Sequence, residues 1–175
     1  MGEIYKPKDV KLLAAVMHRR DFDARPIEEL LTAAYGEVGG RFGPIEFSWS
    51  RYYEEEMGEG LLKYYLIFKA PIDRSRLPSI KNHTNQIESQ FSVSGKRAVN
   101  IDPGYLAKDK LVLASSKDFY HRLYLGEGIF GEVTLHYRKG RFRHFSWTYT
   151  DYQGPEFYKF LEAAREELAG GRGAA

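Results

Sequence analysis

Apolar and polar residues in the first half of the chain follow the spacings of both strands and helices. The run KLLAAVMH (residues 11–18) is almost continuously apolar, which indicates a buried strand. Pro26 follows, and the apolar residues after it recur at helical spacing as far as the pair Gly39 and Gly40. A helix is therefore predicted between Pro26 and these two glycines.

Four further elements complete the order of the first half. Residues 45–49 and 61–69 have the pattern of strands, residues 77–91 that of an amphipathic helix, and residues 97–101 that of another strand. The order strand, helix, strand, strand, helix, strand is typical of a ferredoxin-like α+β sandwich, in which helices cover one face of a mainly antiparallel sheet. We predict this fold class.

The second half is expected to extend the sheet with hairpins and to end in a helix. Strands are predicted at residues 110–115, 119–125, 132–138 and 141–149. Gly140, in the sequence RKGR, marks a tight turn between the last two strands. The terminal helix starts near Pro155, where apolar residues again follow helical spacing.

Length and composition narrow the possible functions. The 175 residues suffice for one domain, which we place at residues 1–169, followed by a disordered tail at residues 170–175. With 26 Lys and Arg against 24 Asp and Glu, the net charge of +2 argues against a general polyanion binder but allows a local basic patch. The absence of cysteine excludes disulfides, thiolate catalysis, zinc fingers and iron–sulfur clusters.

Targeting and membrane signals are not evident in the sequence. The N-terminus has no apolar signal region, and the longest apolar runs, such as LLKYYLIF, are far shorter than the roughly 20 residues that span a bilayer. We therefore expect a cytoplasmic protein without a membrane partner.

A glycine-rich stretch, LGEGIFGEV (residues 125–133), has the G-x-G-x-x-G spacing of the protein-kinase phosphate loop. The other kinase motifs are missing, and the chain is too short for two lobes, so a kinase is excluded. The favoured interpretation is a turn between two strands that needs glycine for positive φ angles. In the alternative, the backbone at Gly126 and Gly128 also contacts an anion.

Several segments together resemble one known family. They are YYEEEMG (52–58), Thr84-Asn85, NIDPGYL (100–106), KLVLASSKD (110–118), HRLYLGEGIFGEVTLHY (121–137) and WTYTDY (147–152). The chain resembles an uncharacterised bacterial family, domain of unknown function 4416, over nearly its whole length. The resemblance implies a short single-domain protein and provides no established activity.

The hairpin that contains the glycine-rich stretch brings titratable side chains together. We expect Leu123 and Leu125 to face the core, which turns the intervening side chains to the opposite face. That face then carries Arg122, Tyr124, Glu132 and His136. One interpretation is a solvated surface with an Arg122–Glu132 ion pair. The other is a ligand site, where Arg122 binds an anion and Glu132 or His136 transfers protons.

The segment DPG (102–104) is a second candidate. Proline followed by glycine is typical of a type II turn. Asn100 and Asp102 lie two residues apart on an extended segment, so we expect their side chains to share one side at the end of a strand. Tyr105 and Lys117 are included with them as ligand-binding candidates.

The region from Arg138 to His144 is the densest basic segment of the chain. It is followed by aromatic residues, and basic groups interleaved with aromatics on a sheet are typical of single-stranded nucleic-acid binding. The residues assigned to this alternative are Arg138, Lys139, Arg141, Arg143 and Trp147.

Other polar residues are interpreted structurally. His121 is expected to be largely buried and hydrogen-bonded. Lys81, Asn85 and Glu88 follow helical spacing and are expected to form a solvated strip. The five histidines and the acidic segment 54–59 show no ligand spacing, so no metal site is predicted, and the cofactor stays unknown.

Two hypotheses follow. The first is a protein that binds a small anionic or phosphate-containing ligand, nucleotide-like, on the polar sheet face, with catalysis left open. Its catalytic candidates are Asp102, Glu132 and His136, and its ligand-binding candidates are Asn100, Tyr105, Lys117, Arg122, Tyr124, Gly126 and Gly128. The second is a non-catalytic module that binds RNA or a protein through the basic aromatic hairpin.

Overall fold

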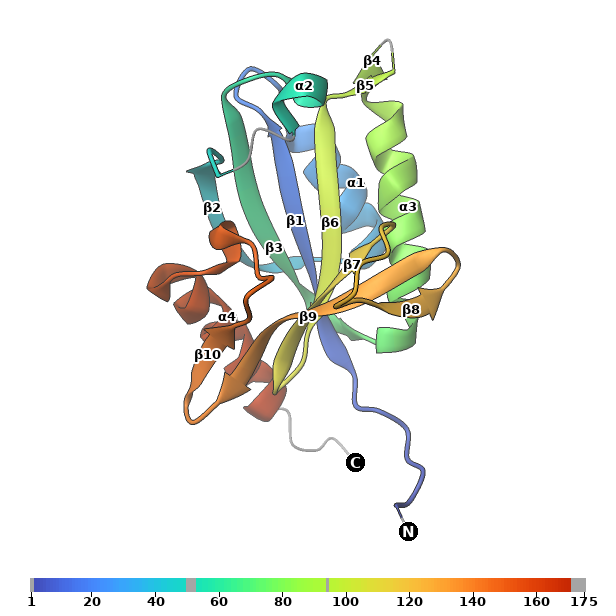
Figure 1. Ribbon diagram of the computed structural model, residues 1–175, viewed down its shortest axis with the longest axis vertical. Coiled ribbons are helices and arrows are strands. Elements are labelled where there is room, and N and C mark those ends of the chain that lie inside the picture. Colours follow the sequence, from blue (N-terminus) through green and yellow to red (C-terminus); the bar gives the residue numbers. More distant parts are fainter. Residues whose placement is uncertain (1, 50–52, 94, 171–175) are drawn as a thin grey trace.

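The computed structural model describes residues 2–49, 53–93 and 95–170, and within them eight strands form one open antiparallel sheet (Figure 1). The strands are β1 (Val10–Arg19), β2 (Val38–Glu46), β3 (Leu61–Ile72), β6 (Val99–Leu106), β7 (Lys110–Ser115), β8 (Leu123–Gly126), β9 (Ile129–Arg138) and β10 (Arg141–His144). Their order is β10-β9-β7-β6-β1-β3-β2, and β8 pairs with β9. The predicted α+β class with a mainly antiparallel sheet is confirmed.

Helices and short turns connect these strands. They are α1 (Arg25–Tyr35), α2 (Glu54–Met57), α3 (Leu77–Gln90), α4 (Pro155–Gly170), the 3-10 turns η2 (Arg74–Arg76) and η3 (Thr150–Tyr152), and a small ribbon of β4 (Ser92–Val93) and β5 (Lys96–Arg97). No helix in the described ranges is long and apolar enough to cross a membrane. Apart from Gly170, the predicted tail lies outside the described residues.

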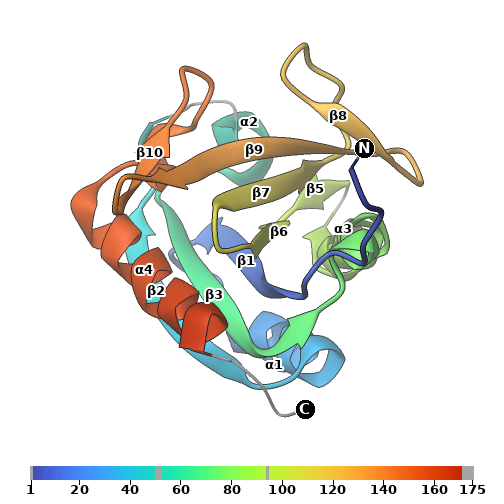
Figure 2. The same ribbon diagram turned by 90° about the horizontal axis from the view of Figure 1, so that it is seen from below.

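The sheet carries a core on each face. In β1, Leu12 and Ala14 belong to the core beneath α1 and α3, whereas Leu13 and Ala15 belong to a second core beneath α4. Figure 2 shows how the second core is enclosed: the sheet curls, so that β9 and β10 come round towards α4. The curl brings the C-terminal half over a face that helices α1 and α3 leave open.

The first helix ends earlier than predicted. It stops at Tyr35, and Gly36 follows with a φ of 90°, so the predicted stop signal Gly39–Gly40 lies inside β2. A Cβ atom on Gly40 would approach the ring of Phe160 in α4 to 3.3 Å. The glycine therefore belongs to a close contact between a strand and a helix, which helical spacing could not reveal.

The predicted turn at Asp102-Pro103-Gly104 is wrong, because these residues form the middle of β6. Asp102 pairs with Ala15 of β1, and a Cβ atom on Gly104 would lie 2.4 Å from a backbone oxygen of β7. The N–H and C=O groups of Ile101 bind side chains of α3 and therefore point away from β1. Because every second residue of a strand turns its backbone groups to the same edge, the backbone nitrogen of Pro103 also points away from β1. Proline is tolerated there because β7 pairs with β6 only from Gly104 onwards.

The C-terminal strands lie where predicted, with different bounds. Residues 110–115 match β7, whereas 119–125 shortens to β8 and 141–149 to β10. The tight turn is confirmed: Lys139 and Gly140 both have positive φ angles, 53° and 76°, between β9 and β10.

Candidate functional site

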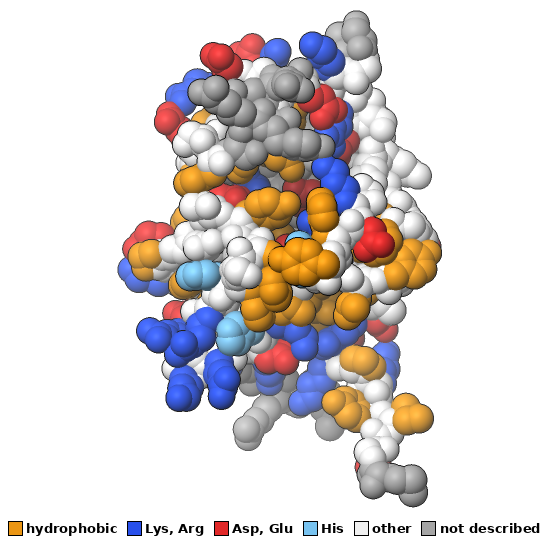
Figure 3. Space-filling model, in the orientation of Figure 1, with side chains coloured by type: hydrophobic (Ala, Val, Ile, Leu, Met, Phe, Trp, Pro, Cys, Tyr) orange, Lys and Arg blue, Asp and Glu red, His pale blue; other side chains and the backbone are white. Residues whose placement is uncertain are grey.

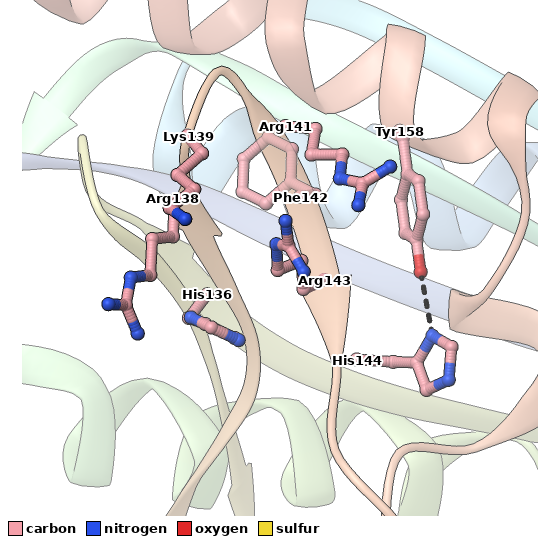
Figure 4. Close-up of a pocket in the computed structure, with 8 residues that line it drawn as sticks. All are labelled: His136, Arg138, Lys139, Arg141, Phe142, Arg143, His144 and Tyr158. Atoms are coloured by element: carbon pink, nitrogen blue, oxygen red, sulfur yellow. Dashed lines mark hydrogen bonds between the residues drawn. The ribbon is translucent and has the colours of Figure 1, made fainter.

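A hollow of about 690 Å³ lies against the β9–β10 hairpin (Figure 4). Its wall is made by side chains of the two strands and their turn, and by one tyrosine from α4. The lining residues are His136, Arg138, Lys139, Arg141, Phe142, Arg143, His144 and Tyr158. Four of these side chains are permanently cationic at neutral pH, and none of these lining residues is acidic.

The hairpin places two arginines opposite one another, and a third opposite a histidine. Arg141 pairs with Arg138 across the two strands, and Arg143 pairs with His136. Within the described chain, Arg138, Lys139, Arg141 and Arg143 form no ion pair, and the Nε atom of Arg143 is buried without a hydrogen-bond partner. Directly opposed like charges destabilise a strand pair. An anion in the hollow would offset this repulsion.

A row of neighbouring rings continues from the hollow. The ring centroid of His136 lies 4.9 Å from that of Phe145, with the two rings tilted. Stacked pairs follow, Phe145 on Trp147 with centroids 4.7 Å apart, Trp147 on His121 at 5.3 Å and His121 on Phe119 at 6.0 Å. The indole N–H of Trp147 donates to a backbone carbonyl of β9 at 3.1 Å. These contacts attach the segment after β10 to the sheet, so the ring of Trp147 has a structural role.

The predicted outward face of β8 and β9 is wrong. Leu123 and Val133 are exposed, whereas the side chains of Arg122 and Glu132 are only 5% and 2% exposed. Glu132 lies opposite Leu113 of β7, whose side chain packs in the second core, so Glu132 also points inward. The error has a physical cause: β8 pairs only with β9, and its leucines have no core to face.

Arg122 and Glu132 form a buried ion pair with further hydrogen bonds. Arg122 Nε donates to Glu132 Oε2 at 2.8 Å, and its Nη1 donates to Ser115 Oγ at 2.9 Å. The imidazole of His121 lies 3.2 Å from the same carboxylate, and Thr134 also contacts it. His121 is thus hydrogen-bonded and largely buried, as predicted. Because each charge is already matched, this pair stabilises the β7–β9 region rather than presenting free groups to a ligand.

The favoured interpretation of the glycine-rich stretch is confirmed in part, because Glu127 and Gly128 form the turn between β8 and β9, whereas Gly131 lies inside β9. Gly126, Glu127 and Gly128 have φ angles of 111°, 55° and 75°, which explains the two glycines. The Gly128 N–H donates to the hydroxyl of Tyr124 at 3.3 Å, and Asn82 of α3 contacts the tip. The local contacts of this loop are therefore with its own hairpin and with α3.

Asn100 and Asp102 do share one side of β6, as predicted, but they belong to a network that the sequence did not reveal. Asn100 donates to Asp102 at 2.8 Å, and Lys81 of α3 contacts the other oxygen of Asp102 at 3.2 Å. Arg97 donates to both Asn100 and Glu88. The predicted solvated strip on α3 is thus wrong, because Lys81 and Glu88 are buried.

Helix α3 provides side chains where β6 lacks a neighbouring strand. Lys81 donates to the carbonyl of Ile101 at 2.8 Å, and Glu88 accepts from its N–H at 2.7 Å. Burial raises the pKa of Glu88, and the nearby Lys81 only partly opposes this. Burial also acts to raise the pKa of Asp102, but Lys81, Lys63 and the hydrogen bond from Asn100 together outweigh this effect, so the pKa of Asp102 lies below its usual value.

The remaining candidates lie apart from the hollow. Tyr105 is half-buried beside the guanidinium of Arg74, and burial raises the pKa of its phenol. Lys117 is exposed, and its backbone carbonyl accepts from Arg122. The predicted ligand-binding residues therefore divide among the β6 network, the Arg122–Glu132 pair and the glycine connection. Of the first hypothesis, only His136 lines the hollow.

Tyr158 and a group of buried polar residues were missed. His144, which the sequence placed in the basic segment without assigning it to a site, completes the hollow together with Tyr158, and its Nδ1 atom lies 3.3 Å from the phenolic oxygen. Inside the second core, Lys63 and Tyr65 both bind one oxygen of Asp151 at 2.6 Å. The lysine inside the apolar run LLKYYLIF was the sequence signal for the buried Lys63–Asp151 ion pair. No group of three acidic or histidine side chains in the described ranges is arranged to hold a metal ion.

Comparison with known proteins gives one result. Residues 8–168 match the model of the family described as Domain of unknown function (DUF4416). No curated protein and no solved structure matches the chain. The matched residues run from the start of β1 to the last turns of α4 and include the β9–β10 hairpin. The chain belongs to the DUF4416 family.

Proposed function

We propose that this protein binds a phosphate-bearing, nucleotide-type ligand in the hollow beside the β9–β10 hairpin. The observation that carries the proposal is the set of four cationic side chains that no carboxylate of the described chain neutralises. Guanidinium groups suit phosphate because their N–H donors match two oxygens at once. The volume also lies within the roughly 300–1,000 Å³ range of ligand pockets.

Neighbouring groups suit the remainder of such a ligand. Phe142 and Tyr158 contribute aromatic surface to the same wall, and His136 and His144 add imidazole groups. In Figure 3 the Lys and Arg side chains gather at the lower left, over the β9–β10 hairpin. We therefore place the expected anion at the hairpin and not at Arg122, because the charge of Arg122 is already matched by Glu132. We propose binding only and no reaction.

The same phosphate chemistry has two sources, a free nucleotide and single-stranded RNA. Binding is to be measured by thermal shift and fluorescence anisotropy with inorganic phosphate, mononucleotides and a labelled oligonucleotide. For RNA, each phosphate contacted lowers the slope of log affinity against log salt by roughly 0.7. If the ligand is a free nucleotide, mononucleotides saturate the site, and the affinity does not depend on the length of the oligonucleotide.

The matched variants are Arg141→Ala/Arg143→Ala and, as a control, Arg20→Ala/Arg25→Ala, which removes the same charge from exposed positions elsewhere. Each charged hydrogen bond contributes about 1.5–3 kcal/mol. We expect the hairpin variant to weaken binding at least tenfold and the control to leave it within about twofold. Equal effects of both variants, or no binding of any of these probes, would refute the proposal.

We also propose that residues 10–106 have a ferredoxin-like topology. The sheet order β6-β1-β3-β2 supports it, with α1 between β1 and β2 and α3 between β3 and β6. Both helices pack on the same core. Nuclear Overhauser contacts of β1 with both β3 and β6 test this arrangement, and contacts between β1 and β2 instead would contradict it.

A further inference from the structure

We infer that β8 is the interface of a symmetric dimer, in which two copies of this chain pair through their β8 strands. The first observation is the exposure of the strand. Leu123, Tyr124 and Leu125 are 75%, 64% and 42% exposed, and β8 pairs only with β9, so its outer edge is open. This inference is independent of the proposed ligand, because the hollow lies at the other end of β9.

The other outer strands of the sheet carry charges or proline. Strand β8 carries neither, although it is short and its pairing with β9 shifts register at Leu125. Exposed edges in monomeric proteins usually carry charges or proline, which prevent pairing with another chain. Strand β2 has Arg41, Pro44 and Glu46, and β10 has Arg141 and Arg143. The sequence of β8 is LYLG, without a charge or a proline. The absence of charge and proline therefore distinguishes β8 as the edge that can pair with another chain.

The sequence of β8 also selects its occupant. Leu123-Tyr124-Leu125 reads the same in both directions. Antiparallel pairing about a two-fold axis at Tyr124 therefore places leucine opposite leucine and tyrosine opposite tyrosine, with no like charges facing each other. A second copy of the chain satisfies this symmetry by construction, whereas an unrelated strand would have to match it separately.

The apolar surface around β8 is large enough for a stable contact. Tyr120 and Val133 are exposed next to the three strand residues. Figure 3 shows hydrophobic side chains across the front face and out to the right, where β8 lies in Figure 1. These five side chains together expose on the order of 600 Å², taking about 200 Å² for each fully exposed side chain. A standard interface buries about 800 Å² per partner, and complete burial of these five side chains would supply most of it.

The chain offers a direct test because it contains no cysteine. Opposed residues of an antiparallel pair have Cα atoms about 4.5–5.5 Å apart, within the range that a disulfide bridges. A Tyr124→Cys variant should therefore form a covalent dimer under mild oxidation. Tyr149→Cys is the control, because Tyr149 is similarly exposed but lies outside β8.

Light scattering coupled to size exclusion then measures the mass of the unmodified chain. We expect a dimer at micromolar concentration, a monomer for Leu123→Glu, and an unchanged dimer for Ile4→Glu, in which an exposed apolar residue outside β8 is altered. Circular dichroism verifies that Leu123→Glu remains folded. A monomer at every concentration, a dimer that resists Leu123→Glu, or open-ended aggregates would each overturn the inference, as would equal cross-linking of both cysteine variants.

Discussion

Removal of the Glu132 carboxylate should destabilise the protein far more than removal of an exposed carboxylate. The side chains of Arg122 and Glu132 are almost inaccessible, and their ion-pair atoms lie 2.8 Å apart. Glu132→Ala leaves the guanidinium buried without its counter-charge, and breaking a buried pair in this way costs about 3–5 kcal/mol. For a protein of this length that corresponds to a decrease in Tm of roughly 6–20 °C.

The matching control is Glu46→Ala, which breaks an exposed Arg–Glu pair with Arg20. Exposed pairs contribute about 0–1 kcal/mol, so this variant should resemble the unmodified protein. A double variant, Arg122→Met/Glu132→Leu, removes both charges and retains side-chain volume. It should recover most of the lost stability, because replacing a buried pair with apolar groups is often neutral.

Urea unfolding followed by tryptophan fluorescence measures all three variants, since Trp147 stacks on His121 beside the pair. The reasoning is refuted if Glu132→Ala loses less than about 1 kcal/mol, as expected of an exposed pair. It is equally refuted if the double variant is as unstable as the single one. Either result would restore Glu132 as a candidate for chemistry.

Three further results are expected. Gly104→Ala should lose about 3 kcal/mol or more in urea unfolding, because its Cβ would lie 2.4 Å from a backbone oxygen of β7. Gly131→Ala should lose less stability, because the atoms nearest its new Cβ belong to the movable side chain of Leu125. Equal losses of stability in the two variants would contradict this geometry. Tyr152→Phe should raise the Tm, because the hydroxyl of Tyr152 is buried without a hydrogen-bond partner. A clear decrease in Tm would show that this hydroxyl does have a partner. Burial raises the pKa of Tyr35 and of Tyr64 to about 12 from 10.0, so stability should be complete below pH 10 and decrease between pH 10 and 12. Absorbance at 295 nm measures this ionisation, and full ionisation of the folded protein near pH 10 would contradict it.

Apolar patterns predicted the elements whose apolar residues are buried in a core. Residues 77–91 and 110–115 lie almost as expected, because α3 has one apolar face on a core and β7 is apolar and buried on both faces. Pairing partners, in contrast, depend on tertiary contacts. Lys81 and Glu88 have the spacing of a solvated strip, yet they bind the backbone of β6 where a strand is missing.

The candidate site was predicted only in part, because some of its residues are close along the chain and others meet only through tertiary contacts. The basic hairpin follows from the sequence because Arg138 to Arg143 are close along the chain and their turn has a local signature. The contribution of Tyr158 depends on how α4 docks, which no local pattern specifies. The pleat of β8 was wrong because leucine was taken as a sign of a core, whereas here it marks an uncovered edge.

The division of the interior into two cores has a consequence for biosynthesis. The buried members of the first core all lie between Val10 and Ala107, whereas the second core needs residues of α4 as far as Ala164. A nascent chain that emerges from the ribosome N-terminus first can therefore consolidate one side of its sheet while Leu13 and Ile67 on the other side still await the last helix. Until α4 has emerged and docked, that face exposes apolar surface of the kind that chaperones bind.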